Sequence, residues 1–351
     1  MKKAASDKEK RHLLKANTYS QMGLLESDQA NLDEAIVLYN KALAIYQKYG
    51  KEPNMGTMLN NIALAYTEQG KYHRALDTYH QALEIQIRIN NERAQGKIYA
   101  NIAITHKMLG EYNKAFDNHH KSLALHRQTG HVRFEGVVLS NLGNLYLVQG
   151  RFSEAFDVVK QALELHTKTG DQRMLGIGRL NLGTIHADAG NYPEALACYE
   201  AAADILADPL DERIESILFG KRGVCYFHVE HWSQAVDCFE KAIELSNGQI
   251  PEAYEFYGFL AVLRHRDGRK DEAQDLLREG EVGLANIPEL LGKLWCQRAQ
   301  VLVEDGQMEE VPELLRKAAA VADKLEVTKE GSLRRSIGVA TTLYNKHAEP
   351  T

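Results

Sequence analysis

Four asparagines recur at intervals of 40 residues in this chain of 351 residues: Asn61, Asn101, Asn141 and Asn181. A primary amide offers two N–H donors and one carbonyl acceptor, the groups that hydrogen-bond a polypeptide backbone. Asparagine is also a poor helix former, because its side chain competes for nearby backbone hydrogen bonds. A second asparagine, Asn144, follows only the third of these positions. The recurring amides are therefore candidates for hydrogen bonding, either to a ligand or between repeats.

Three cations stand on the segment of the last of these asparagines and on the equivalent segment of the next repeat. Lys221 takes the asparagine position of the next repeat, and Arg179 and Arg222 stand where other repeats carry apolar or aromatic residues. Arginine binds carboxylates with two parallel hydrogen bonds, so we expect the three cations to receive an acidic side chain or a terminal carboxylate. The alternative is that the arginine stems pack while their heads lie in water or pair with Asp188 or Glu215.

Motifs for catalysis are missing from the sequence. It contains no Gly-x-x-x-x-Gly-Lys-Ser/Thr, no Gly-x-Ser-x-Gly and no His-Glu-x-x-His. Its 14 histidines do not recur with carboxylates at ligand spacing. We therefore predict a protein that is not an enzyme, with no catalytic residue, no metal site and no cofactor.

The elements that carry these residues are helices. Four turn glycines are each followed by a polar residue, an aromatic residue and, five places on, an alanine: Gly70, Gly110, Gly150 and Gly190. Before the first of them, Leu59, Ile62, Ala63 and Tyr66 form an i, i+3, i+4, i+7 stripe, which is typical of a helix. The frame extends to about eight units in all. Since neither helix of a unit can bury its stripe alone, successive hairpins must stack.

The stretch "NLGNLYLVQGRFSEAFDVVKQAL", residues 141–163, resembles the tetratricopeptide repeat in its small, aromatic, glycine and alanine positions. The 40-residue form resembles Pins-type adaptors, kinesin light chains and bacterial regulators. The resemblance implies an all-α fold, a right-handed α-solenoid of about eight helix hairpins plus a C-terminal capping helix. We expect a frayed N-terminus at 1–12, an array at 13–327 and a capping helix at 328–347, in which Arg334, Arg335 and Lys346 face water. The expected repeats are 13–50, 51–90, 91–130, 131–170, 171–208, 209–247, 248–286 and 287–326.

In arrays of this family the first helices line a concave groove, so the resemblance implies a ladder of amides along that groove. The ligand implied is a protein or an extended peptide with acidic character near one end. The alternative is that the amides bond to the neighbouring repeat and tie the units together. The predicted peptide-binding residues are Asn61, Asn101, Asn141, Asn144, Asn181, Arg179, Lys221 and Arg222.

Composition narrows the class of partner and the compartment. The formal net charge of −6 gives no reason to expect nucleic acid. No apolar run approaches ~18 residues, so we expect no membrane span, and the start lacks an apolar signal region. Four cysteines without a Cys-x-x-Cys pair indicate reduced thiols and a cytoplasmic protein. The prediction is a non-enzymatic scaffold or adaptor; the alternative is a regulatory sensor whose superhelix changes pitch when it binds a signalling peptide or small ligand.

Overall fold

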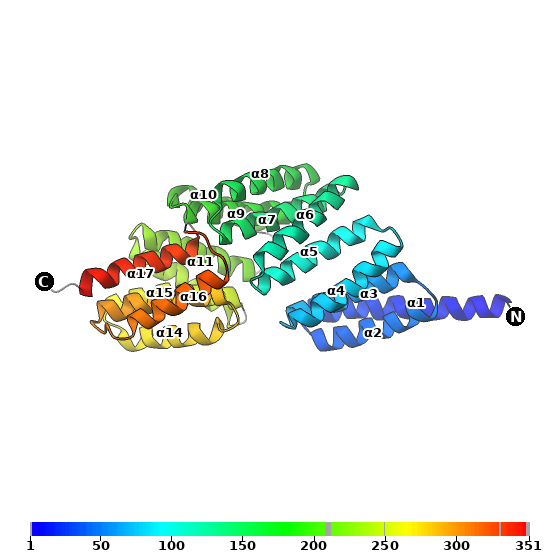
Figure 1. Ribbon diagram of the computed structural model, residues 1–351, viewed down its shortest axis with the longest axis horizontal. Helices are drawn as coiled ribbons and strands as arrows, with labels where there is room; N and C mark the ends of the chain where they lie inside the picture. The colour runs from blue at the N-terminus through cyan, green and yellow to red at the C-terminus, as the bar shows by residue number, and fades with distance from the viewer. Residues whose placement is uncertain (1, 208–211, 249, 330, 349–351) are drawn as a thin grey trace. The chain divides into compact units, whose positions relative to one another are not determined.

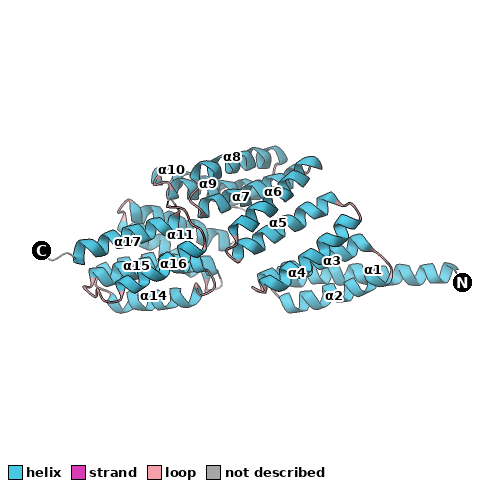
Figure 2. Cartoon of the chain, viewed as in Figure 1, coloured by secondary structure: helices cyan, strands magenta, loops and turns pink. Residues whose placement is uncertain are grey.

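The computed structural model describes residues 2–207, 212–248, 250–329 and 331–348. Within these ranges the chain forms seventeen α-helices and one short 3-10 helix, with no strand (Figures 1 and 2). Consecutive helices pair as eight hairpins, and one further helix follows them. The prediction of an all-α solenoid of about eight hairpins with a C-terminal helix is confirmed. The predicted boundary between the fifth and sixth repeats, at 208 and 209, lies outside the described residues.

The chain divides into two compact units, Met1–Val138 and Leu139–Thr351. We call them unit 1 and unit 2. Unit 1 holds α1 (Lys2–Asp28), α2 (Leu32–Lys48), α3 (Glu52–Glu68), α4 (Tyr72–Arg88), α5 (Glu92–Met108), α6 (Tyr112–Gln128) and the start of α7 (Val132–Val148).

Unit 2 holds the end of α7 and all later elements. These are α8 (Phe152–Thr169), α9 (Gln172–Asp188), α10 (Tyr192–Leu206), α11 (Glu212–His228), α12 (Trp232–Ser246), η1 (Pro251–Tyr254), α13 (Glu255–Arg266), α14 (Lys270–Gly283), α15 (Pro288–Glu304), α16 (Val311–Lys324) and α17 (Ser332–Ala348).

Each hairpin turns at one residue in the left-handed region of backbone conformation. Gly70 has φ of +72°, and the next N–H, that of Lys71, donates to the carbonyl of Tyr66 at the end of α3. This arrangement satisfies carbonyls at the helix end that would otherwise lack donors. Ala30 and Glu230 replace glycine in the turn, yet each keeps φ at +61°. The turn geometry is therefore retained where its usual residue is lost.

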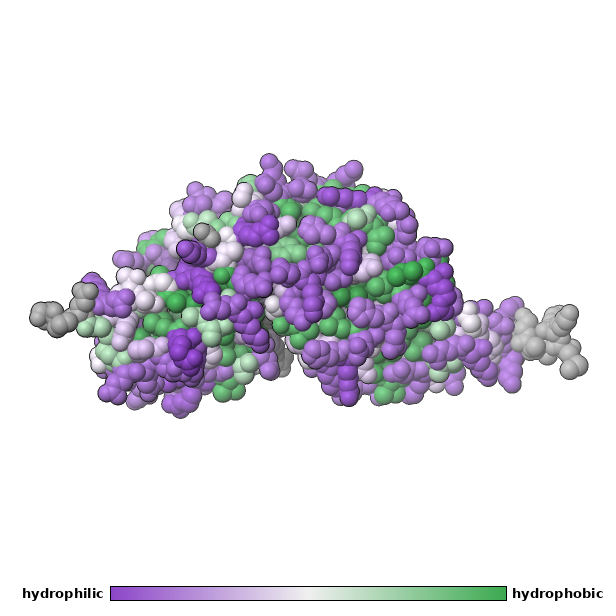
Figure 3. Space-filling view, viewed as in Figure 1, coloured by the Kyte–Doolittle hydropathy of each residue, from purple (hydrophilic) through white to green (hydrophobic). Residues whose placement is uncertain are grey.

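The stripes predicted from spacing form the core between helices. In α3, Leu59, Ile62 and Ala63 are buried, and they belong to one apolar cluster with Ala75 and Tyr79 of α4. The small alanine surfaces let paired helices approach closely, as ridge-into-groove packing requires. Figure 3 shows polar residues over much of the viewed surface, with apolar ones between them.

The two ends of the chain differ from expectation in different ways. Helix α1 begins at Lys2, inside the segment predicted to fray; fraying itself stays a prediction. Helix α17 packs against α15 and α16 (Figure 1). Arg334 and Arg335, predicted to face water, are partly exposed, and each also pairs with a carboxylate: Arg334 with Asp323, and Arg335 with Asp188. Lys346 is exposed, as expected.

Candidate functional site

One position of the repeat, nine residues before the turn residue, is the position of the recurring asparagines. In unit 2 the same position is held by Lys221 on α11, Phe259 on α13 and Gln297 on α15. All three side chains line one cavity of about 490 Å³. The first helices of three successive hairpins, α11, α13 and α15, thus contribute equivalent residues to a single site. We call the first helix of each hairpin its inner helix.

The walls of this cavity are largely apolar. They include Leu147 and Val148 at the end of α7, and Phe227, Phe259 and Leu290 from α11, α13 and α15. Helix α17 supplies a further wall through Ser336, Val339 and Ala340. The cavity is therefore bounded by the inner helices of unit 2 and by the C-terminal helix.

A chain of ion pairs runs across the cavity lining. Lys221 Nζ lies 2.8 Å from Glu255 Oε2, and Lys293 Nζ lies 3.3 Å from Glu255 Oε1. Lys293 also lies 3.6 Å from Glu289 Oε1, which accepts a hydrogen bond of 3.3 Å from Ser332 Oγ of α17. The two lysines and two glutamates balance in charge.

The cluster strongly biases the ionisation of its members. Burial acts to raise the pKa of Glu255, but the charges of Lys221 and Lys293 outweigh it and hold that pKa at about 2. Burial acts to lower the pKa of Lys293, while Glu255, Glu289 and Asp188 raise it further, so the net shift is upward. Glu255 and Lys293 are therefore both charged near neutral pH.

A further ion pair closes the cavity on the side of α17. Arg335 Nη2 lies 3.3 Å from Asp188 Oδ1 at the end of α9, and both residues line the cavity. The Arg335 guanidinium also lies 5.1 Å from the centroid of the Phe152 ring. Both side chains remain partly exposed, so this contact lies at the edge of the site.

The asparagines of unit 1 bond to one another. Asn101 Nδ2 donates to Asn60 Oδ1 at 3.0 Å, and Asn60 Nδ2 donates to Asn61 Oδ1 at 3.4 Å. The first bond joins α5 to α3, so in unit 1 these amides connect neighbouring repeats. Asn60 was not among the predicted residues, although its position beside Asn61 in the sequence was a signal.

The asparagines of unit 2 lack such partners. Asn141 and Asn144 are half-buried on α7, and neither forms a hydrogen bond with another described residue. Asn181 is only 7% exposed, and its Nδ2 has no hydrogen-bond partner within the described part of the chain. None of the three lines the cavity, so they form a separate set of available amides on α7 and α9.

The two predicted arginines differ in their surroundings. Arg179 is exposed on α9 and forms no ion pair with a described residue. Arg222 is half-buried, its Nε has no described partner, and its guanidinium lies 5.8 Å from the centroid of the Phe219 ring. Asp188, one carboxylate considered for them, pairs with Arg335 instead.

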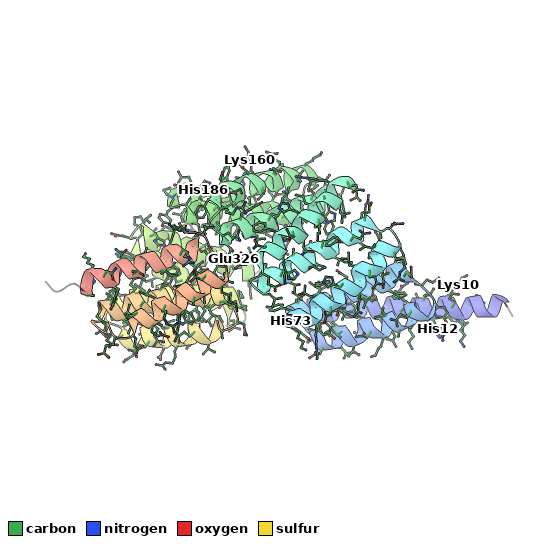
Figure 4. All side chains as sticks on the ribbon, in the orientation of Figure 1. Lys10, His12, His73, Lys160, His186 and Glu326 are labelled. Carbon is green, nitrogen blue, oxygen red and sulfur yellow. The ribbon has the colours of Figure 1, made fainter. Side chains whose placement is uncertain are left out.

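Several residues that line the cavity were not among those predicted from the sequence. Gln297 was detectable, since it stands nine residues before Gly306, in the same register as the asparagines. Glu255 and Lys293 carried a weaker signal: they lie 38 residues apart, at equivalent positions of adjacent repeats, with opposite charges. Figure 4 marks Glu326, which lies in the segment that joins α16 to α17.

The described ranges contain neither a metal-binding cluster nor a membrane-spanning helix. No group of three or more His, Cys, Asp or Glu side chains there has the arrangement needed to hold a metal ion. No helix there combines the length and the apolar character that crossing a membrane requires.

Comparison with known families matches most of the chain to one repeat. A family model described as a tetratricopeptide repeat matches residues 14–88, 54–128, 92–168 and 174–248, and a second model of the same description matches 226–282. These matches confirm the resemblance drawn from the repeat motif. No curated protein sequence matches the chain.

Solved structures with a similar fold include three Rap proteins. The Rap conjugation gene regulator of plasmid pLS20, in complex with the Phr* peptide, has a TM-score of 0.65 and 15% identity, covering 87% of each chain. The apo form of RapI has a TM-score of 0.63 and 17% identity, covering 78% of this chain and 98% of its own. A Rap protein complexed with Competence and Sporulation Factor has a TM-score of 0.57 and 13% identity, covering 97% and 99%. At these identities the likeness shows the fold.

Proposed function

Because this chain belongs to the tetratricopeptide repeat family, we propose that it is a non-enzymatic scaffold that binds a segment of a partner protein or a peptide. Arrays of this kind present a long surface built from equivalent positions of successive repeats, which suits an extended ligand. All four cysteines are free thiols, so we propose the cytoplasm as the compartment in which it acts.

The observation that carries this proposal is the cavity of unit 2. Its volume of about 490 Å³ lies within the range of roughly 300–1,000 Å³ that is usual for ligand sites. Apolar walls with a few fixed polar groups are also usual for such sites, since the apolar area supplies affinity and the polar groups supply orientation. Here Lys221, Phe259 and Gln297 mark the path of a ligand across three repeats.

We assign the available amides of unit 2 to the backbone of the bound segment. Asn141, Asn144 and Asn181 have donors or acceptors without described partners, and an amide can meet both the N–H and the C=O of a peptide group. Asn61 and Asn101 already take part in the network with Asn60, so a ligand there would compete with contacts between repeats. The two roles proposed for the asparagines are thus divided between the units.

The acidic end of the ligand, in this proposal, lies near Arg179. That cation is exposed and carries no described ion pair, so it can bind a carboxylate without displacing another one. Lys221 is held by Glu255 at 2.8 Å, and an acidic ligand group would have to compete with that carboxylate. Arg222 has an unpartnered Nε but is half-buried, which leaves it a secondary contributor.

The names of two structural neighbours support a peptide ligand. One is a Rap protein complexed with Competence and Sporulation Factor, and the other is a Rap regulator in complex with the Phr* peptide. A ligand-responsive sensor is therefore our second candidate. It is favoured by the contact of α17 with α9, because a ligand that enters the cavity must meet this helix.

The proposal is tested by selecting ligands from a display library of random peptides with the full-length chain. Selected peptides are then titrated by fluorescence polarisation against the wild type and against Asn181→Ala combined with Gln297→Ala. Removing two amides that bond the ligand should weaken binding by about 10-fold or more, since one such loss costs on the order of 1–3 kcal/mol.

A matched control combines Asn40→Ala with Asn118→Ala. Asn40 is exposed and Asn118 is half-buried, each on a helix, and the side chain of each donates to a carbonyl one turn earlier in its own helix. The control should bind like the wild type. A library that yields no peptide above background, or equal affinity for the test and wild-type chains, contradicts the proposed function.

A further inference from the structure

The segment that ends the chain contacts a region far back in the sequence. Thr328 Oγ1, between α16 and α17, donates a hydrogen bond to the carbonyl of Gln149, which lies 179 residues earlier. Gly331 approaches the same region so closely that a Cβ added there would lie 3.3 Å from the carbonyl oxygen of Val148. A helix that only capped the last hairpin would need neither contact.

Arg335 carries this connection into the cavity. Its guanidinium pairs with Asp188 of α9 at 3.3 Å and lies 5.1 Å from the centroid of the Phe152 ring. Arg334, its neighbour in the sequence, pairs with Asp323 of α16 instead. Of these two arginines, Arg335 pairs with α9 at the edge of the cavity, while Arg334 stays with the adjacent helix.

The face that α17 turns to the cavity is apolar, and its Ala340 is buried in one apolar cluster with Cys296 and Ala299 of α15. Val339 and Ala340, four and five residues after Arg335, line the cavity together with Ser336. Val339 nevertheless remains 67% exposed. The helix therefore closes one side of the cavity without filling it.

We propose that Thr328 and α17 together form a C-terminal latch, an internal ligand that the partner segment displaces. This inference rests on the proposed function for the identity of the site. The entering segment must do what the latch does: supply a cation to Asp188 and apolar side chains to the wall now lined by Val339 and Ala340. The preferred partner therefore carries a basic residue followed by small apolar residues.

The contact of the latch with α9 is weak enough to be exchanged. Its ion pair is partly exposed, with 38% of the Arg335 side chain and 26% of the Asp188 side chain accessible, and such pairs contribute little in water. Glu326, in the link before it, adopts φ of +51°, a conformation that side chains other than glycine rarely take. Gly338 lies inside α17 with no neighbouring atom to restrain a side chain there, and glycine weakens a helix interior.

Cys296 provides a readout of latch opening in the full-length chain. This thiol lines the cavity and is 4% exposed, whereas Cys225 is fully buried and lies outside the cavity lining. We expect Arg335→Ala to speed the labelling of Cys296 by a thiol reagent by about 2- to 5-fold, with Cys225 unchanged. Labelling at each cysteine is followed by mass spectrometry, and circular dichroism checks that the variant stays helical.

Two further variants make the labelling test specific. Asp188→Ala should speed labelling of Cys296 as Arg335→Ala does, and the double variant should add little, because both remove the same contact. Arg334→Ala should leave the Cys296 rate unchanged. An unchanged Cys296 rate in Arg335→Ala, or an equal increase at Cys225, overturns the latch.

Exchange of the latch is tested with a labelled synthetic peptide of residues 331–345. It should bind the full-length Arg335→Ala chain about 2- to 5-fold more tightly than the wild type, whose own α17 already contacts Asp188 and the cavity. A peptide carrying Arg335→Ala, or a chain carrying Asp188→Ala as well, should lose that gain. Faster Cys296 labelling without any binding of this peptide overturns the internal-ligand assignment.

These outcomes separate the latch from the proposed function. If display-selected peptides bind the wild type and Arg335→Ala equally, the latch is wrong while the scaffold function stands. If only the 331–345 peptide binds and the library yields nothing, the scaffold function and displacement by a partner fail, while the role of α17 as an internal ligand stands.

Discussion

Lys221 Nζ lies 2.8 Å from Glu255 Oε2, and this contact joins the inner helices of two successive hairpins. Glu255 is 8% exposed and also bonds Lys293, so one carboxylate holds two cations on α11 and α15. Removing that carboxylate would leave two lysines close together in a poorly solvated site. The Lys221–Glu255 pair therefore both lines the cavity and stabilises the packing of α11 against α13 in unit 2.

Glu255→Gln should lower the free energy of unfolding by roughly 3 kcal/mol, because breaking a buried ion pair leaves its partners uncompensated. The measurement is urea unfolding followed by circular dichroism at pH 7. Glu313→Gln serves as the control: Glu313 forms an exposed i, i+3 pair with Arg316, which solvent screens, so its loss should change the free energy of unfolding far less. Equal effects of the two substitutions would show that the Glu255 cluster is not coupled to folding.

The same carboxylate predicts a dependence on acid. Its pKa falls from 4.5 to about 2 in the folded chain, so its contribution is present above pH 4.5 and is lost as the pH falls toward 2. Stability curves of the wild type and Glu255→Gln should therefore converge over that interval. Curves that stay parallel from pH 6 to 3 contradict the assignment.

Two buried histidines in unit 1 predict a second loss of stability on acidification. It begins below about pH 6.5, at a higher pH than the loss that involves Glu255. Burial, helped by nearby positive charges, lowers the pKa of His119 from 6.5 to about 3 and that of His126 to about 4. Below pH 6.5 the unfolded chain binds protons that the folded chain excludes, so stability falls by about 1.4 kcal/mol per pH unit for each histidine. Unfolding by urea at pH 7, 6 and 5 measures this slope.

The repeat itself supplies the matched variants for that experiment. Tyr79 and Gln86 stand 40 residues before His119 and His126, in the equivalent places of the preceding hairpin. His119→Tyr combined with His126→Gln should flatten the slope between pH 6.5 and 5. A slope that persists in the double variant would assign the acid sensitivity to other groups.

Two glycines inside helices predict opposite effects of the same substitution. A Cβ on Gly220 of α11 would collide with the Phe256 ring of α13, so Gly220→Ala should destabilise by about 1–3 kcal/mol. A Cβ on Gly338 of α17 meets no atom within 4 Å, and Gly338→Ala should stabilise that helix by up to about 1 kcal/mol. Thermal unfolding compares the two, and a shift of the same sign in both would contradict this packing.

The amide network of unit 1 predicts coupling between two asparagines on different repeats. Asn60 accepts a hydrogen bond from Asn101 at 3.0 Å. A double-mutant cycle with Asn60→Ala and Asn101→Ala should give a coupling energy of about 0.5–1.5 kcal/mol in urea unfolding. A control cycle pairs Asn101→Ala with Asn118→Ala. Asn118 lies on another helix and bonds to a carbonyl of that helix, so this cycle should show no coupling. Coupling below about 0.3 kcal/mol between Asn60 and Asn101 contradicts the bridging role.

The sequence predicted the features that depend on local periodicity. The stripe of Leu59, Ile62 and Ala63 required only helical spacing, and the turn at Gly70 followed from its place in the frame. These features recur in neighbouring repeats, so the pattern in each repeat strengthens the prediction for the others.

The sequence did not predict contacts that depend on how hairpins rotate against each other. The bond of Lys221 to Glu255 requires α13 to present a particular face to α11. The pairing of Arg335 with Asp188 depends on the sum of the small rotations between several successive repeats. Each of these rotations is too small to be predicted from the residues of one repeat. A charged residue at a known register position therefore indicated a surface but not its partner.

The central claim is that the inner helices of unit 2 hold the ligand, and site-specific crosslinking measures this directly. A display-selected peptide carrying a benzophenone group is irradiated with the full-length chain, and the adducts are mapped by mass spectrometry. The account predicts adducts on α9, α11, α13 and α15 around Phe259 and Gln297, and competition by excess unlabelled peptide. Adducts confined to α12 and α14, the second helices of their hairpins, would contradict it.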